Sequence, residues 1–231
     1  MSAQAKTRPT TPRKFSDVTR WDNELDIAVI GFGGAGACAA IEASDAGADV
    51  AIFELSSASG GSTALSSAEI YLGGNGGTRV QKACGYDDST ENFFNYMMMC
   101  QGEQADEEKI RLYCEGAVDH FDWLVDKGIP FKDSEFKERA IMVTTDDGLL
   151  YTGNEKAWPF TTVAEPIPRG HNLHVMGDNG GPLFMKILTE NVEQRNIPVE
   201  YETRALTLIQ DDDGTVRGVV MNPVDHPHGG G

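Results

Sequence analysis

The sequence predicts an α/β fold built around a parallel β-sheet. A run rich in β-branched residues covers positions 25–30 and ends at Gly31. Small residues then continue at helical spacing to Gly47, and a second apolar run, 50–53, ends at Glu54. Strand, glycine turn, helix and strand in this order form a βαβ unit. Such a unit requires parallel strands joined by a right-handed crossover.

Capping and turn residues predict the other elements. Ser89 and Asp106 are suited to cap two helices, and apolar spacing predicts a third helix at 182–195. The remaining segments read as strands at 199–210 and 215–220, a hairpin at 141–152 around the turn 146–148, and a loop at 164–181. These elements extend the fold well beyond the first βαβ unit.

Composition divides the chain into three parts. Residues 1–24 are polar and locally basic, and a segment with little to bury is expected to be a flexible leader. Residues 25–220 carry the apolar patterning of the α/β domain. Residues 221–231 contain two prolines and end in three glycines, which predicts a flexible tail.

Charge and hydropathy exclude several classes of function. The 231 residues include 36 acidic and 19 basic side chains, for a formal net charge of -17. A general nucleic-acid binder needs a basic surface, so no nucleic-acid partner is expected. No apolar run is long enough to span a membrane and no signal-peptide segment is present, so a cytoplasmic location is expected. The four cysteines form no CxxC pair and His171 and His174 lack a third ligand, so no metal site is expected.

The turn after the first strand matches the pattern GxGxxG through Gly31, Gly33 and Gly36. Gly31 allows the tight turn, and Gly33 lets the backbone of the turn, which includes Gly34 and Ala35, approach a pyrophosphate. Gly36 allows the helix to pack closely on the strand. The positive end of the helix stabilises the phosphate charge. This combination predicts a Rossmann-like dinucleotide-binding domain.

Two downstream features bear on which dinucleotide binds. Glu54 is placed to accept hydrogen bonds from an adenosine ribose, and its charge disfavours the 2′-phosphate of NADP. NAD and FAD both remain open on this ground. A second glycine-rich loop with hydroxyl groups follows, and it contains Gly60, Gly61, Ser62 and Thr63. This loop suits the longer FAD molecule better than NAD.

These motifs resemble a known family. Segments 26–36 and 60–66, together with Glu54, are similar to the N-terminal part of the fumarate reductase/succinate dehydrogenase flavoproteins. Their FAD domain has a βαβ core of the glutathione-reductase type. The sequence Ser-Thr-Ala-Leu-Ser at 62–66 and the segment 70–74 most resemble the 3-ketosteroid dehydrogenase branch. The resemblance covers about residues 21–220.

The resemblance implies a flavin-dependent oxidoreductase that dehydrogenates or reduces a carbon–carbon bond next to a carbonyl. A steroid is then the expected small-molecule substrate. Covalent members carry a His just before the second loop; residues 55–59 contain none, so FAD is expected to be non-covalent. The family adds Ser66 and Ala205 to the expected cofactor residues, the latter because its strand backbone contacts adenine. A fumarate- or urocanate-type reductase, a catalytically silent FAD-binding fragment and an NAD-dependent dehydrogenase stay open as alternatives.

Two departures from the family pattern bear on activity. Residues 67–69 are Ser-Ala-Glu where the steroid branch usually has glycines, and their side chains could crowd the backbone that faces the flavin. The family's capping domain and catalytic residues are expected beyond residue 231, so the domain is expected to be incomplete and no catalytic residue is assigned. The reactive side chains in the loops, none with a family role, are Tyr71, Arg169, His171 and His174. Oligomeric state is not predicted.

The last eleven residues, 221–231, depart from the flavoprotein pattern. They resemble a loop of the second large-subunit ribosomal protein through the sequence Asn-Pro-Val-Asp-His-Pro-His-Gly-Gly-Gly. Because the basic domain around that loop is missing, RNA binding is not inferred. The tail is expected to be foreign sequence from a fusion, recombination or assembly junction.

Overall fold

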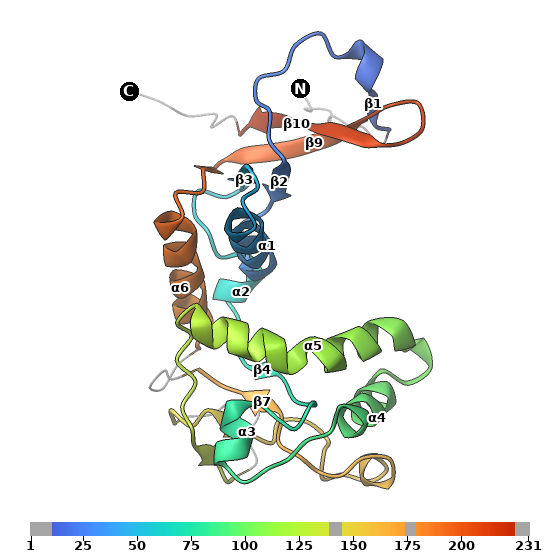
Figure 1. Cartoon of the computed structure of the whole chain (residues 1–231), viewed down its shortest axis with the longest axis vertical. Coiled ribbons are helices and arrows are strands. Elements are labelled where there is room, and N and C mark those ends of the chain that lie inside the picture. Colours follow the sequence, from blue (N-terminus) through green and yellow to red (C-terminus); the bar gives the residue numbers. More distant parts are fainter. Residues whose placement is uncertain (1–10, 139–144, 174–178, 225–231) are drawn as a thin grey trace, which may run out of the picture. The chain divides into compact units, whose positions relative to one another are not determined.

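The computed structural model describes residues 11–138, 145–173 and 179–224, and the chain divides into two compact units (Figure 1). Unit 1 combines residues 1–61 with 188–231, and unit 2 consists of residues 62–187. The expected α/β architecture is confirmed in unit 1. Among the described residues, no helix is both long and apolar enough to cross a membrane.

Unit 1 contains the parallel sheet that the βαβ pattern predicts. Strand β2 (Ile27–Ile30) pairs in parallel with β3 (Val50–Phe53), and β3 pairs in parallel with β8 (Val199–Glu200). The crossover helix α1 (Gly34–Asp45) packs on β2 and β3 through a buried face of small and apolar residues, Ala37, Ala40 and Ile41. Since parallel strands share their carboxyl edge, the turn after β2, Glu54 after β3 and Tyr201 after β8 all emerge at one side of the sheet.

The predicted strand at 199–210 is two strands in the structure. Its first residues form β8 in the parallel sheet, and the chain then turns at Tyr201–Glu202 into β9 (Thr203–Gln210). β9 pairs antiparallel with β10 (Val216–Pro223), in the long ribbon visible in Figure 1. The strands predicted at 199–210 and 215–220 therefore do pair as a hairpin, and residues 211–215 connect them. The apolar pattern did not reveal that the chain changes sheets at 201–202.

The ends of the domain differ from their expected bounds. Strand β1 (Arg13–Lys14) pairs in parallel with β9, and the short helix η1 (Phe15–Asp17) follows it, so part of the expected flexible leader has regular structure. Trp21 lies against Gly218 and near Phe15, with ring centroids 6.0 Å apart. These two aromatic side chains supply the apolar contacts that the composition of the leader concealed. β10 continues three residues past 220, to Pro223, while residues 1–10 and 225–231 lie outside the described residues.

The predicted helix at 182–195 is α6 (Gly181–Gln194), which begins in unit 2 and ends in unit 1. Leu188 and Val192 are fully buried. Arg195, just after α6, forms a bidentate ion pair with Asp45 at the end of α1, with N–O distances of 2.6 and 2.9 Å. This pair holds the ends of the two helices together.

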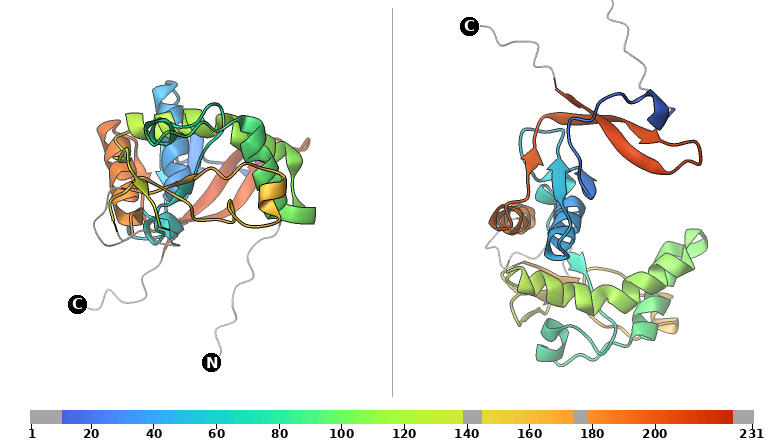
Figure 2. Two further views of the ribbon diagram at one scale, coloured as in Figure 1. Left: turned by 90° about the horizontal axis from the view of Figure 1, so that it is seen from below. Right: turned by 45° about the horizontal axis from the view of Figure 1, so that its top comes forward.

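Unit 2 contains the two helices whose caps the sequence predicts. Ser89 Oγ accepts the backbone N–H of Asn92 at 3.1 Å and begins α4 (Thr90–Gln101). Asp106 Oδ1 accepts the N–H of Lys109 at 3.2 Å and begins α5 (Glu107–Asp126). The two helices pack together (Figure 2). The short elements of the unit are α3 (Arg79–Ala83), α2 (Gly61–Ala64, whose first residue belongs to unit 1), η2 (Gly102–Gln104) and η3 (Phe160–Thr162).

A small mixed sheet completes unit 2. Its order is β4 (Ile70–Tyr71), β7 (Gly170–His171), β6 (Leu149–Leu150) and β5 (Glu135–Phe136). The second strand of the hairpin expected at 141–152 is β6, which pairs with β5 in parallel and with β7 antiparallel. Most of the first strand of that hairpin, 141–144, lies outside the described residues. The segment predicted as a loop at 164–181 contributes β7 to this sheet and the first residue of α6, and its residues 174–178 lie outside the described residues.

Candidate cofactor site

The glycine turn is closed by backbone contacts that only glycine permits. Gly31 has a φ of +98°, and its N–H donates to the carbonyl of Phe53 at the end of β3, at 2.8 Å. A Cβ at Gly36 would overlap the carbonyl oxygen of Gly31. Gly33 is the N-cap of α1, and the first turn of the helix has no acidic residue. The positive end of the helix dipole at Gly34 and Ala35 can therefore stabilise a phosphate.

Glu54 ties the glycine turn to the end of β3. Its Oε2 accepts the N–H of Phe32 at 2.6 Å, and its Oε1 accepts the N–H of Ser56 at 2.7 Å. Partial burial acts to raise the pKa of Glu54, but these backbone hydrogen bonds outweigh it and the pKa is lowered. The group is thus a carboxylate at neutral pH. Each oxygen keeps acceptor capacity for a hydroxyl group such as a ribose would offer.

The second glycine loop lies directly against the first. The N–H of Gly60 donates to the carbonyl of Phe32 at 2.8 Å, and a Cβ on Gly61 would stand 3.6 Å from the Cα of Gly33. Both Gly60 and Gly61 have positive φ, +139° and +52°. The two motifs that the sequence separates by more than twenty residues are therefore adjacent in unit 1.

Phe32 is the residue at the centre of this arrangement, although the GxGxxG motif assigns no role to its position. Its N–H binds Glu54, its carbonyl binds Gly60, and its side chain is only 1% exposed. The signal in the sequence is a large apolar residue at the variable position between Gly31 and Gly33 of the GxGxxG motif. Its backbone joins the first loop, the second loop and the acidic residue.

The other expected cofactor residues lie on both sides of the division between the units. The chain passes from unit 1 to unit 2 between Gly61 and Ser62. Ser62 and Thr63 are in α2, and Ser66 Oγ donates to the carbonyl of Thr63 at 2.8 Å and accepts the N–H of Ala68 at 3.1 Å. Ser66 is thus part of a local turn. Ala68 has a φ of +53°, a left-handed conformation that explains why glycine suits this position.

Ala205 is exposed on β9, opposite Met221 of β10. Two residues before it, the N–H of Thr203 donates to the backbone carbonyl of Glu54 at 2.8 Å. β9 therefore starts beside the acidic residue of the site. This is the arrangement that an adenine contact from the β9 backbone would require.

Three of the reactive side chains of the predicted loops, Tyr71, Arg169 and His171, have hydrogen-bond partners within unit 2. Arg169 is fully buried and makes a bidentate pair with Asp88, at 2.7 and 2.8 Å. Tyr71 donates to Glu155 at 2.7 Å, and burial together with that carboxylate raises the pKa of Tyr71. His174 lies outside the described residues.

His171 is buried between two hydrogen bonds. Its Nδ1 lies 2.8 Å from the carbonyl of Arg169, which can only accept, so Nδ1 carries the proton. Nε2 then accepts the hydroxyl of Thr78, at 2.7 Å. Burial lowers the pKa of His171 to about 4. The described residues contain no group of three or more His, Cys, Asp or Glu side chains that could hold a metal ion.

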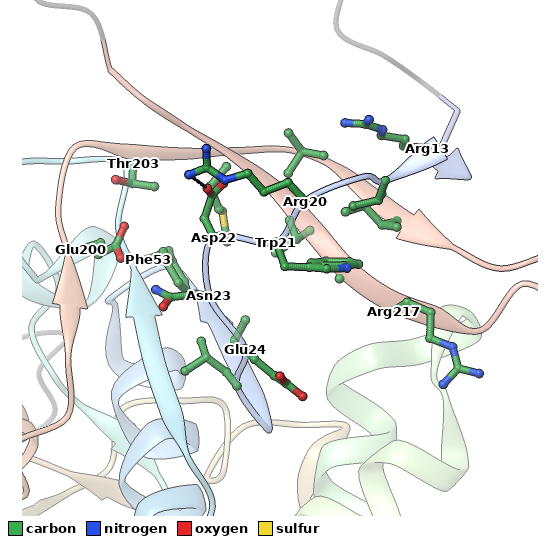
Figure 3. A pocket seen from close by; sticks show the side chains of 18 of the residues that line it. Arg13, Arg20, Trp21, Asp22, Asn23, Glu24, Phe53, Glu200, Thr203 and Arg217 are labelled. Atoms are coloured by element: carbon green, nitrogen blue, oxygen red, sulfur yellow. Dashed lines mark ion pairs between the residues drawn. The ribbon is translucent and has the colours of Figure 1, made fainter. Parts of the chain in front are cut away.

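A cavity of about 700 Å³ opens elsewhere in unit 1 (Figure 3). Side chains from the segment 13–25, including Arg20 and Trp21, form one part of its wall, and residues of β3, β9 and β10 form another. None of the expected cofactor residues lines it. The backbone cradle at the carboxyl edge of the sheet, rather than this cavity, carries the features of a dinucleotide site.

Comparison with known proteins agrees with this geometry. A family model described as FAD binding domain matches residues 26–230. The structure of a 3-ketosteroid-Δ4-(5α)-dehydrogenase from Rhodococcus jostii, in complex with 4-androstene-3,17-dione, is 49% identical with a TM-score of 0.87; the match covers 92% of this chain and 44% of that chain.

Two curated relatives are more distant. A 3-oxo-5-alpha-steroid 4-dehydrogenase of Comamonas testosteroni is 28% identical over 208 residues, covering 88% of this chain and 38% of the relative. A fumarate reductase (cytochrome) of Shewanella frigidimarina is 28% identical over 197 residues, covering 85% and 29%. The chain therefore spans less than half the length of each of these three proteins.

Proposed function

The chain belongs to the FAD-binding domain family of the fumarate reductase/succinate dehydrogenase flavoproteins, and on that basis we propose how it holds its cofactor. The adenosine diphosphate half of FAD binds at the carboxyl edge of β2, β3 and β8. The glycine turn and the start of α1 hold the pyrophosphate, and Glu54 accepts hydrogen bonds from the ribose. The glycine motif alone is compatible with either NAD or FAD, and FAD is the cofactor of this family.

One observation carries this proposal: Phe32 joins the two glycine loops and Glu54 through its own backbone. Gly60 and Glu54 bind its carbonyl and N–H, respectively, so the three parts of the cradle are connected before a ligand arrives. A preorganised cradle loses little conformational freedom on binding. Positive φ values at Gly31, Gly60 and Gly61 fit a backbone that approaches a ligand closely.

We further propose that the whole protein is an oxidoreductase acting on a carbon–carbon bond next to a carbonyl, with a steroid as substrate. The 49% identity to a dehydrogenase crystallised with a steroid favours this class over a fumarate- or urocanate-type reductase. Bound FAD supplies the hydride chemistry. This chain's residues bind and orient it, and no residue is assigned to proton transfer. Non-covalent attachment and a cytoplasmic location stay predictions.

Flavin retention tests the cofactor proposal. The purified full chain is expected to carry stoichiometric flavin, read from its visible absorption. Gly36→Ala is expected to weaken FAD retention roughly tenfold or more, because the new Cβ overlaps the carbonyl of Gly31 and displaces α1 from the turn. Gly116→Ala is the matched control, since Gly116 is also in a helix but has open space around it. A colourless chain that FAD does not convert to a bound form would instead support the silent-fragment alternative.

Substrate class is tested with the full-length gene product. Reduction or oxidation of a 3-ketosteroid, with no turnover of fumarate, is the expected result. Turnover of fumarate with no activity on any steroid would assign the protein to the reductase class instead.

A further inference from the structure

Tyr201 lies at the proposed cofactor site, although the sequence motifs assign it no role there. It connects β8 to β9 at the carboxyl edge of the parallel sheet, and it is 38% exposed. The backbone around it is bound to the segment that carries Glu54. Glu54 N–H donates to the carbonyl of Glu200, and Thr203 N–H donates to the carbonyl of Glu54, both at 2.8 Å. Tyr201 is therefore held next to the segment that carries the carboxylate expected to bind the ribose.

The ring of Tyr201 stands on Phe32 of the glycine turn. The two ring centroids are 6.4 Å apart and the planes are inclined by 27°, so the rings are stacked. The hydroxyl group of Tyr201 lies beside the side chain of Ser59, at the start of the second glycine loop. One aromatic side chain thus contacts both loops, and a substantial part of its surface still faces solvent.

The backbone next to Tyr201 is in an unfavourable conformation. Glu202 has a φ of +53°, the left-handed region that residues other than glycine rarely adopt. Its N–H donates to the carbonyl of Ser56 at 3.0 Å, which holds the turn in place. The turn keeps this conformation although part of the Tyr201 ring stays in solvent. Such strain is typical of positions that hold a ligand.

We propose that Tyr201 forms an aromatic wall for the adenine of FAD. The proposal rests on the proposed function, in which Glu54 binds the ribose. Adenine is bonded directly to that ribose, so a planar base reaches the ring beside Glu54. A base stacks on an aromatic face whatever its edge pattern, and contacts of this kind contribute strongly to nucleotide affinity. Tyr201 thereby helps the site select FAD over FMN, which lacks adenine.

Binding to the cofactor-free full chain tests this role. Tyr201→Leu keeps an apolar group on Phe32 but removes the aromatic face, and Tyr201→Trp keeps an aromatic face. The leucine variant is expected to bind FAD and ADP roughly 5- to 150-fold more weakly, with FMN affinity unchanged. The tryptophan variant is expected to stay within about threefold of the unchanged protein for both nucleotides. Tyr113→Leu in unit 2, with a tyrosine of similar exposure, is the control and should not alter FAD affinity.

Each result has one interpretation. FAD binding by the unchanged chain together with equal FAD affinity in Tyr201→Leu would overturn the role of Tyr201 and leave the proposed function standing. No FAD binding by the unchanged chain would overturn both. Thermal unfolding without cofactor separates folding from binding: a leucine variant that melts like the unchanged chain but loses ADP affinity supports the wall. Equal loss of FMN and FAD affinity would contradict it.

Discussion

The buried ion pair between Arg169 and Asp88 provides a sharp test of how unit 2 is stabilised. Both side chains are fully buried. Asp88 also accepts the N–H of Gly74 at 3.1 Å and the side-chain amide of Asn92 at 3.1 Å, so its carboxylate is satisfied on both oxygens. Burial acts to lower the pKa of Arg169, but the hydrogen bonds and charge of Asp88 outweigh this effect and raise it. The arginine therefore stays charged and depends on Asp88.

Asp88→Asn removes the negative charge without changing the shape of the side chain. The guanidinium is then left buried without a counter-charge, which is expected to cost about 3–5 kcal/mol of unfolding free energy. That is a large share of the 5–15 kcal/mol typical of a native domain. The double variant Asp88→Leu with Arg169→Met removes both charges, and its stability is expected to lie closer to that of the unchanged protein.

The chain contains its own control in the pair between Arg195 and Asp45. This pair has the same bidentate geometry, but its side chains are 21% and 40% exposed. Asp45→Asn should therefore cost about 0.2–1 kcal/mol. Urea unfolding of the full chain, followed by far-ultraviolet circular dichroism and tryptophan fluorescence, measures both variants. If Asp88→Asn costs no more than Asp45→Asn, burial does not decide the contribution of this pair and the reasoning fails.

Two further predictions concern pH and the N-terminal segment. The pKa of His171 is lowered from 6.5 to about 4. The neutral side chain therefore contributes stability that is complete above pH 6.5 and is lost as the pH falls to about 4. At 1.36 kcal/mol per pKa unit, this contribution to the free energy of unfolding is about 3 kcal/mol. His171→Gln should flatten that part of the curve of unfolding free energy against pH, and an unchanged slope would contradict the assignment. Gly218→Ala places a Cβ 2.6 Å from the ring of Trp21, so residues 11–24 should become more sensitive to trypsin. Equal rates of cleavage in the variant and the unchanged protein would show that the Trp21 ring does not hold this segment.

The glycine turn and the position of Glu54 were predictable because their requirements are local. Gly31 and Gly60 have positive φ, and a Cβ at Gly36 would overlap the carbonyl oxygen of Gly31. Glycines required in this way form a motif that can be recognised in the sequence. Glu54 follows from the end of an apolar run. The sequence did not reveal that Phe32 connects these parts, because its hydrogen bonds use backbone atoms that every residue has.

The elements that were missed depend on partners far away in the sequence. Arg13 pairs with Ile209, so no window of neighbouring residues shows that β1 is a strand. The change of sheet at Tyr201 was missed for a related reason, since β8 and β9 are both apolar enough to read as one strand. The two strands differ in their partners: β8 pairs with β3, whereas β9 pairs with β1 and β10.

The loops of unit 2 show a second limit of sequence reasoning. Prolines, glycines and polar side chains at 164–181 predict an exposed loop, and the rule holds for most such segments because buried polar groups need partners. Arg169 and His171 do have partners, Asp88 and Thr78, but these are 81 and 93 positions earlier in the chain. Once those contacts form, the polar side chains lie in the interior and the loop strand β7 can join the sheet. Reactive residues in a predicted loop are therefore weak evidence for a catalytic site unless their possible buried partners are also considered.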